Sequence, residues 1–446
     1  MKRALSLAFV LALVLGAACT PGLARSYRRF DGVKLEFIMV DDPQVYAIRK
    51  HLPEFKKLTG IDVTITEYPL SSLMEKQLLS LISGTGKPDL VGFDLWFVGA
   101  FGRTDTLLPL DSFINELKND RDFDFADLLS RHVEGYRYKD RQIGVGFIPV
   151  QMLQVYRKDL FESPKYRSEF KAKYGYDLKP PETMKQFMDV VKFFTRDTDG
   201  DGKIDLWGTA TQMQRDDPIY CAFTHFMYPY GGEIIDPKTK RPVFNSKTNV
   251  RALTDFVTMV HNYCPPGTLG YGWGDMTAAM QKGDVAIQLN WNVFMGEYED
   301  PSKSKVAGKL GYTPTPGEVT KRSLLGGWGI GINKQSRNKE AAKEFIRWLL
   351  SKETDLAVTL SGGAAPMRVS TYKNAEVAKR FPHGPASNLT AAYSTPPPPV
   401  PEFPAILEIV GLALSEAASK QKSPKEALDD AQAKLDDVMR GAGYYK

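Results

Sequence analysis

Residues 34–40 read Lys-Leu-Glu-Phe-Ile-Met-Val, a short β-rich run that stops at an Asp-Asp-Pro turn. Apolar residues then recur at helical spacing until Thr59-Gly60, which predicts a helix and its end. Residues 61–66 (IDVTIT) alternate as a second strand, a second helix follows, and residues 88–93 (PDLVGF) form a third strand. Strands that alternate with helices through short connections predict an α/β fold with a parallel sheet covered by helices.

Polar and aromatic residues follow two of these strands. Asp41 and Asp42 end the first strand, and Asp94 and Trp96 come directly after the third. Ligands of open parallel sheets bind beyond the carboxyl ends of the strands. We therefore expect a binding site at this edge.

Length and composition limit the class of protein. The chain has 446 residues, too many for one compact core, and at roughly 150 residues per domain it predicts two or three domains. Apolar residues make up 43% and charged residues 25%, which is ordinary for a globular protein and excludes disordered and multi-span membrane classes. Its 58 basic and 53 acidic residues leave a net charge of +5, too small and too dispersed for a dedicated nucleic-acid binder.

The N-terminus has the pattern of a secretory signal peptide over residues 1–24. Lys2 and Arg3 precede an apolar run at 4–14, and small residues lead to Cys19. Cleavage before Cys19 would free a cysteine for a lipid anchor, whereas cleavage after Ala24 would release a soluble chain, and both alternatives stay open. Either predicts export, to the periplasm or to the outer face of the cell membrane.

Two further cysteines, Cys221 and Cys264, form an even pair in an exported chain. An oxidising compartment permits a disulfide, so we favour that bond over two buried thiols. The five histidines are scattered, and neither a zinc spacing nor a catalytic nucleophile motif occurs.

Residues 197–205 (DTDGDGKID) match the first nine positions of a calcium loop. Carboxylates at alternate positions, a glycine for the turn and a backbone carbonyl at position seven can surround a hard cation. The twelfth position, which usually carries a bidentate Glu, is Gly208. The pattern favours a weak structural Ca²⁺ site over a solvated acidic turn, with ligands Asp197, Asp199, Asp201, Lys203 and Asp205.

Four stretches together resemble the extracellular solute-binding proteins of ABC importers, in the carbohydrate-binding family that includes maltose-binding protein. In chain order they are residues 55–63 (FKKLTGIDV), 83–90 (SGTGKPDL), 156–161 (YRKDLF) and 326–333 (GGWGIGIN). The resemblance covers nearly the whole mature chain.

The resemblance implies a type II periplasmic-binding-protein fold, with two α/β lobes, hinge crossings and a ligand cleft between them. Lobe one would hold residues 27–147 and 309–330, and lobe two residues 150–306 and 334–446. Crossings would fall near 146–151, 305–311 and 329–333, where glycines suit a hinge. The implied function is the substrate-binding component of an ABC sugar importer, a monomer without enzymatic activity or catalytic cofactor that delivers its ligand to the permease subunits.

The same resemblance, with the chemistry of sugars, selects candidate ligand contacts. Sugars offer apolar faces to aromatic rings and hydroxyls to carboxylates and arginine. The candidates are Asp41, Asp42, Asp94, Trp96, Tyr228, Trp291, Trp328 and Arg368.

Two alternatives remain. A glycerol phosphate-like ligand would require more clustered Arg and Lys than these loops contain. A secreted carbohydrate-active enzyme would require paired carboxylates at a fixed separation, such as Asp41 and Asp94, which no catalytic motif supports.

Overall fold

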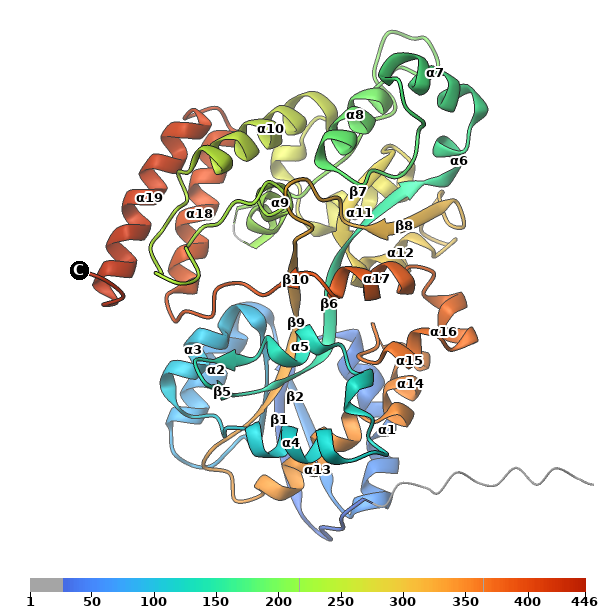
Figure 1. Ribbon diagram of the computed structural model, residues 1–446. Helices are drawn as coiled ribbons and strands as arrows, with labels where there is room; N and C mark the ends of the chain where they lie inside the picture. Colours follow the sequence, from blue (N-terminus) through green and yellow to red (C-terminus); the bar gives the residue numbers. More distant parts are fainter. Residues whose placement is uncertain (1–26, 216, 364) are drawn as a thin grey trace, which may run out of the picture.

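Two lobes share one mixed sheet in the computed structural model, which describes residues 27–446 except 216 and 364 (Figure 1). Along the sheet the strand order is β2-β1-β3-β9-β6-β7, with β8 paired to β6 and β10 to β9, and β4 and β5 form a separate hairpin. The strands are β1 (Lys34–Val40), β2 (Asp62–Tyr68), β3 (Leu90–Asp94), β4 (Arg137–Tyr138), β5 (Arg141–Gln142), β6 (Val145–Arg157), β7 (Ile287–Trp291), β8 (Leu310–Pro314), β9 (Ser323–Ile332) and β10 (Ser394–Thr395).

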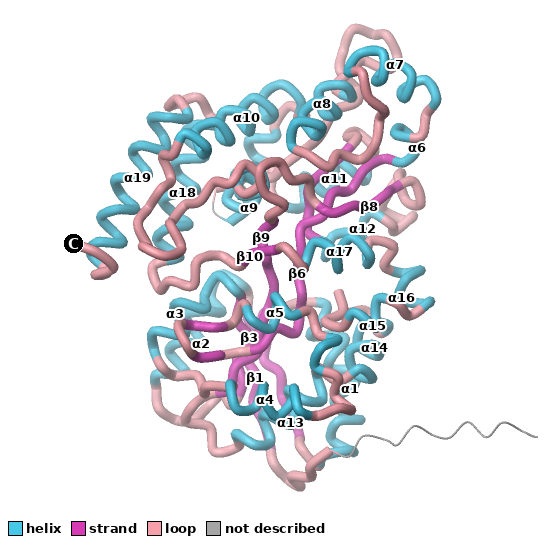
Figure 2. Tube along the Cα trace, in the orientation of Figure 1, coloured by secondary structure: helices cyan, strands magenta, loops and turns pink. Residues whose placement is uncertain are grey.

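Lobe one has the strand–helix alternation that the sequence predicts. β1 pairs in parallel with both β2 and β3, and β9 closes this part of the sheet in the antiparallel sense. Helices cover the sheet on both sides (Figure 2). The helices of this lobe are α1 (Pro43–Thr59), α2 (Leu70–Ile82), α3 (Val98–Thr104), α4 (Asp111–Asn119), α5 (Ser130–Glu134), α13 (Lys339–Leu349), α14 (Lys352–Leu360), α15 (Val369–Tyr372) and α16 (Ala375–Arg380), with short 3₁₀ turns η1 (Leu95–Phe97) and η2 (Phe125–Asp127).

An aromatic cluster attaches α13 to lobe one. The ring of Phe345 lies 6.1 Å from Phe37 and 5.3 Å from Phe55, centroid to centroid. Trp348 lies 4.8 Å from Phe55. Full burial of such a side chain contributes about 1.5–3 kcal/mol, so α13 belongs to this core although it is distant from it in sequence.

Lobe two is mainly helical around the outer half of the sheet. A capping box of Thr183 and Gln186 starts α8, whose inward face presents Phe187, Val191 and Phe194 as the periodicity predicts. The helices of this lobe are α6 (Lys158–Phe161), α7 (Pro164–Tyr174), α8 (Met184–Phe194), α9 (Asp217–Met227), α10 (Lys247–Tyr263), α11 (Trp273–Lys282), α12 (Met295–Tyr298), α18 (Phe403–Ala418) and α19 (Pro424–Gly441), with 3₁₀ turns η3 (Thr268–Gly270) and η4 (Asn292–Phe294).

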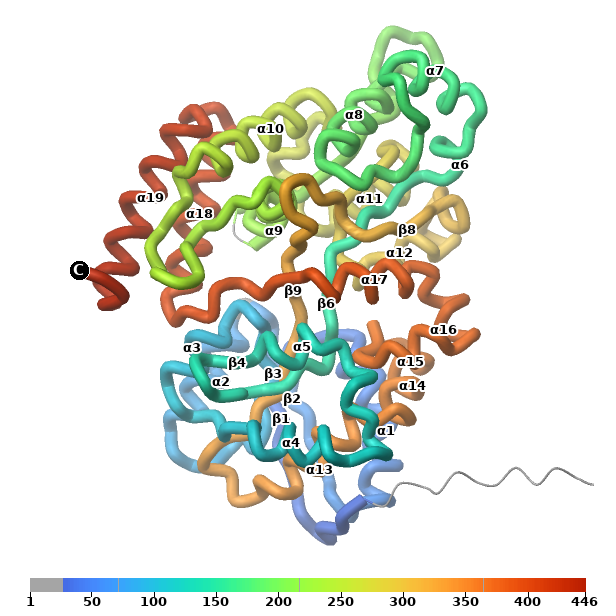
Figure 3. The backbone as a smooth tube through the Cα atoms, viewed as in Figure 1, coloured from blue at the N-terminus to red at the C-terminus, as the bar shows by residue number. Residues whose placement is uncertain are grey.

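Two strands carry the chain between the lobes (Figure 3). Residues 145–151 of β6 pair with β9, whereas residues 152–157 pair with β7 and β8 in lobe two. β9 continues into lobe one beside β3. Gly327 in β9 has φ of +133°, which a side chain would strain, and the hydroxyl of Tyr136 donates to its carbonyl at 2.6 Å. Both strands were expected to act as crossings.

The third crossing differs from the expectation. Residues 305–311 stay inside lobe two, because β8 hydrogen-bonds to the outer half of β6. The chain instead returns to lobe two through α17 (Gly384–Ala391), β10 and the proline-rich run 396–401. The structure therefore groups 310–314 with lobe two and α13–α15 with lobe one, unlike the expected bounds.

Within residues 27–446, apart from 216 and 364, no helix has both the length and the apolar character that crossing a bilayer requires.

Candidate functional site

Each lobe presents the same strand–turn–helix elbow to the junction between them. β3 runs into η1 and α3, and β7 runs into η4 and α12. Asp94 (φ −73°, ψ 154°) and Trp291 (φ −65°, ψ 139°) occupy the equivalent extended position before each 3₁₀ turn. β7 is antiparallel to the crossing strand β6, so its carboxyl end, like that of β3, meets the junction. Strand ends from both lobes thus converge there.

Strand register brings three of the candidate residues together. Asp94 pairs with Trp328 across β3 and β9, and directly opposed side chains of an antiparallel pair are neighbours. Ile38 pairs with Val91, so Asp41, three residues on, is level with Asp94 on the adjacent strand. Asp41, Asp94 and Trp328 are therefore neighbours at the carboxyl edge of lobe one.

Asp94 is a buried acid. Its side chain accepts a hydrogen bond from the backbone N–H of Trp96 at 3.0 Å, and the residue is only 8% exposed. Burial raises its pKa to about 8 despite that bond, and the carboxyl of Asp217, in the first turn of α9 in lobe two, raises the pKa further. Burial therefore favours the protonated form of Asp94, which can donate a hydrogen bond as well as accept one.

Asp41 and Asp42 start α1. Asp42 is the N-cap and accepts from the backbone N–H of Gln44 at 2.7 Å, and burial raises its pKa. Asp41 is exposed and accepts from the hydroxyl of Tyr46. Asp42 therefore caps the N-terminus of α1, and Asp41 faces solvent.

The predicted tryptophans occupy three different environments. Trp96 of lobe one stacks on Phe403 of α18 at 5.3 Å and meets Tyr220 of α9 edge-on at 5.4 Å, so it joins the lobes. The ring of Trp291 lies over Gly326, where a β-carbon would come within 3.2 Å of it. Trp328 is 9% exposed and belongs to the core of lobe one.

Tyr228 packs inside lobe two rather than lining an open loop. It is 3% exposed, and the guanidinium of Arg322 lies 4.2 Å from its ring centroid. Arg322 is itself paired with Glu233.

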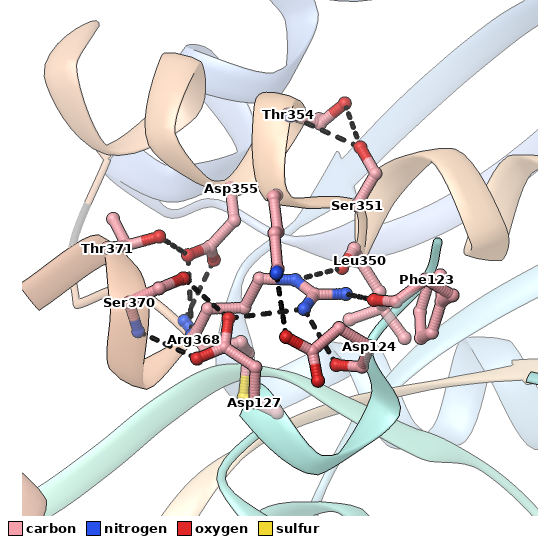
Figure 4. Close-up of polar contacts among 12 residues, drawn as sticks. Phe123, Asp124, Asp127, Leu350, Ser351, Thr354, Asp355, Arg368, Ser370 and Thr371 are labelled. Carbon is pink, nitrogen blue, oxygen red and sulfur yellow. Dashed lines mark hydrogen bonds and ion pairs between the residues drawn. The ribbon is translucent and has the colours of Figure 1, made fainter. Parts of the chain in front are cut away.

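Arg368 is not a ligand contact in this structure, contrary to the prediction (Figure 4). Its side chain is fully buried in lobe one, where it donates to the carbonyls of Leu350 at 2.7 Å, Phe123 at 2.8 Å and Asp124 at 3.1 Å. It also pairs with the carboxylate of Asp127 at 3.3 Å. These bonds use its donors to hold together three segments of lobe one, which leaves the guanidinium no access to a ligand.

The predicted disulfide is not formed. Cys221 and Cys264 are free thiols, both buried in the core of lobe two. Cys221 faces inward from α9 and Cys264 caps α10, and burial raises the pKa of both thiols. An even number of cysteines does not specify pairing when both side chains pack among apolar neighbours.

The calcium-like loop gathers its first three carboxylates. Oxygens of Asp197, Asp199 and Asp201 lie within 4.8 Å of one another, all exposed. Asp197 accepts from the N–H groups of Gly200 at 2.6 Å and Gly202 at 2.7 Å, bonds that lower its pKa. Asp205 turns back instead to the N–H of Thr198 at 2.8 Å.

A buried polar chain that the sequence did not reveal passes through the junction. Gln151 on β6 donates its N–H to Asn292 of η4 at 3.1 Å and accepts from the Asn292 amide at 2.8 Å. The Gln151 amide nitrogen lies 3.2 Å from Nε2 of His132, whose pKa burial lowers to about 4. The available signal was a polar residue in the middle of a largely apolar crossing strand.

Two more buried residues stand apart. Gln212 and His383 each have both side-chain polar atoms without a hydrogen-bond partner among the described residues. His383 lies between the rings of Tyr312 and Phe381, at 5.7 and 5.6 Å, and burial lowers its pKa to about 3. Gln212 lies in the segment of lobe two that precedes α9.

Comparison with known proteins identifies the family. The family model described as bacterial extracellular solute-binding protein matches residues 42–355. The chain belongs to this family. The resemblance inferred from the four sequence stretches is therefore confirmed, and the chain is a solute-binding protein.

Individual relatives differ in the ligands that their names give. The chain is 26% identical to a probable amino-acid ABC transporter periplasmic-binding protein of Sinorhizobium fredii, over 100% of each. It is 27% identical to a mannitol-binding protein of Pseudomonas aeruginosa, over 84% of this chain and 85% of that one. An ABC transporter solute-binding protein of Agrobacterium radiobacter K84 in complex with ribitol is 26% identical, with a TM-score of 0.77 over 92% of this chain and 100% of its own. The two-lobed type II fold is thus confirmed.

Proposed function

We propose that this solute-binding protein captures a neutral polyol or small sugar between its lobes and delivers it to the permease of an ABC importer. The observation that carries the proposal is the buried carboxyl of Asp94, directly opposite Trp328 in the strand register, at the carboxyl edge of lobe one. A carboxyl group that both donates and accepts suits hydroxyls, and an indole face suits the apolar side of a polyol.

The mannitol-binding relative and the ribitol complex support this ligand class. The relative named for amino acids supports a different ligand class. The α-carboxylate of an amino acid needs an arginine or a comparable cationic partner. Arg368 is saturated inside lobe one, and Arg322 is engaged by Glu233 and Tyr228. The same shortage of arginine disfavours a phosphorylated ligand.

Calorimetric titration of the full chain tests the ligand class. Ribitol, mannitol, erythritol and maltose are titrated beside a set of amino acids and glycerol 3-phosphate. Binding of at least one polyol or sugar, with the charged ligands inactive, is the expected result. Binding of an amino acid alone would replace the proposal with the amino-acid function.

The remaining ligand contacts are proposals of the same kind. Asp41, Asp42, Trp96 and Trp291 stay candidates, because each lies at a strand end or elbow that meets the junction. Tyr228 is not among these candidates, because it is buried in lobe two with the guanidinium of Arg322 over its ring.

We also propose export through the signal peptide, with an N-terminal lipid anchor at Cys19 or a free N-terminus after residue 24. Those residues lie outside the part of the chain that the structure describes. The extracellular character of the family supports export, and intact-mass measurement of the mature protein distinguishes the two cleavage sites.

A further inference from the structure

Gln212 ends an extended segment that runs beside β7. Trp207 and Val285 form a parallel bridge, and the N–H of Ile287 donates to the carbonyl of Gly208 at 3.2 Å. Further along, Thr211 and Leu289 line the same small cavity, so the segment keeps to the side of β7. Gln212 therefore reaches the level of the β7 end, where Trp291 meets the junction.

The surrounding backbone fixes this position. The N–H groups of Met213 and Gln214 both donate to the carbonyl of Tyr271, at 2.8 and 2.9 Å, and α9 begins at Asp217. Trp273, two residues after Tyr271, lies 6.3 Å from Trp291 between ring centroids. The residues around Gln212 are thus tied to the elbow of lobe two.

The side chain of Gln212 is buried without a partner. It is 1% exposed, and neither its Oε1 nor its Nε2 has a hydrogen bond to any described residue. Gln142, a comparably buried amide of lobe one, donates to the carbonyls of Val133 at 2.6 Å and Gly144 at 2.7 Å. Burying an amide without a hydrogen-bond partner is costly. A native chain that keeps one therefore calls for a partner other than the described residues.

We propose that Gln212 is the hydroxyl-reading residue of lobe two and selects ligands with two adjacent hydroxyl groups. Its Oε1 accepts from one hydroxyl, and its Nε2 donates to the oxygen of the next. An amide is neutral and offers donor and acceptor in one plane, which matches a vicinal diol and disfavours an anion. This inference rests on the proposed function, and it assigns lobe two the polar role that Asp94 has in lobe one.

The competing explanation is an internal water. A small cavity is lined by Thr211, the residue before Gln212, and by Thr209 and His225 among apolar residues, and its free volume of about 10 Å³ is near the minimum for one water molecule. If such a water satisfies the amide, Gln212 is purely structural and its replacement leaves ligand affinity unchanged.

Two substitutions, Gln212→Leu and Gln212→Glu, separate these explanations in the full chain. Gln212→Leu removes the unpaired amide, so the melting temperature of the unliganded protein is expected to stay constant or rise. Loss of two hydrogen bonds should at the same time weaken ribitol or mannitol binding about 10- to 100-fold. Gln212→Glu keeps an acceptor but loses the donor, and is expected to bind with reduced affinity too.

Ligand analogues give a second measurement. Wild type should prefer ribitol over its mono-deoxy analogues, and Gln212→Leu should lose that preference for at least one of them. Gln142→Leu is the matched control, expected to lower the melting temperature and leave affinity unchanged, because its amide is satisfied within lobe one.

The outcomes distinguish the two proposals. If Gln212→Leu binds polyols like wild type while Trp291→Ala does not, the inference about Gln212 is overturned and the proposed function stands. If wild type binds no polyol or sugar, both are overturned.

Discussion

At the scale of single residues, the environment of a side chain decides whether it is available to a ligand. Arg322 and Arg368 have the same chemistry. The sequence around them does not indicate that Arg322 is paired with Glu233 or that Arg368 is buried inside lobe one. A fully buried guanidinium with a complete set of acceptors is part of the fold.

Replacement of Arg368 by Met should therefore reduce stability and leave affinity unchanged. The substitution removes the cationic partner of Asp127 and the donor of three carbonyls, which costs about 3–5 kcal/mol. Urea denaturation measures the loss, and calorimetry with a polyol on the folded fraction measures affinity. A variant that keeps its stability but loses the ligand would return Arg368 to the site.

Asp94 makes stability depend on pH. Burial raises its pKa to about 8 in the folded chain from an ordinary value of 3.8, so the folded protein binds the proton more tightly than the unfolded chain. The free energy of unfolding therefore falls as pH rises from about 4 to 8, by up to about 1.4 kcal/mol per pH unit from this group. Asp94→Asn should remove this part of the slope in urea melts at pH 5, 7 and 8.5. An unchanged slope would show that Asp94 is ionised across the range.

At the scale of elements, hydrophobic periodicity predicts which segments form strands and helices but not how distant segments pair. The runs at 34–40, 61–66 and 88–93 are strands, and the helix after Glu182 starts at its capping box, because period and capping are local properties. The position of Asp94 at the end of β3 follows from the same strand pattern. Gln212, Gln151 and the third crossing were missed, because pairing between distant segments leaves no local pattern.

The loop at 197–205 is the element whose predicted role is tested most directly. If it binds Ca²⁺, the ion stabilises the folded state by mass action, by about 2.7 kcal/mol at 100 times its dissociation constant. Chelation should then lower the melting temperature of wild type but not of Asp201→Ala. Asp236→Ala, in another exposed acidic turn, is the control and should stay chelator-sensitive. A wild-type curve that ignores the chelator would identify the loop as a solvated turn.

At the scale of the molecule, three connections join two separate cores. β6 and β9 belong to both halves of the sheet, and the proline-rich run 396–401 leads from β10 to α18. Strands that bend at glycines and a stiff extended spacer allow the lobes to move as units. Contacts between side chains of the two lobes, and ligand when bound, then set how far the lobes separate.

Trp96 has two possible roles, as a contact between the lobes and as a contact with the ligand, and experiments can separate them. Its ring stacks on Phe403 and meets Tyr220, so Trp96→Ala removes a contact between the lobes whatever else it does. Phe403→Ala removes the same stacking from the other side and leaves the indole in place. Both variants should increase the radius of gyration of the unliganded protein in small-angle X-ray scattering.

Affinity then distinguishes the two roles of Trp96. A ring that also touches the ligand contributes on the order of 1 kcal/mol or more beyond the lobe contact, so Trp96→Ala should bind a polyol at least about fivefold more weakly than Phe403→Ala. Equal affinities in the two variants would mean that Trp96 acts only by holding the lobes together. In that event Trp328 and Trp291 are the remaining indole candidates, and Trp291→Ala becomes the decisive substitution, because the Trp291 ring covers Gly326 on the crossing strand at the point where the two lobes meet.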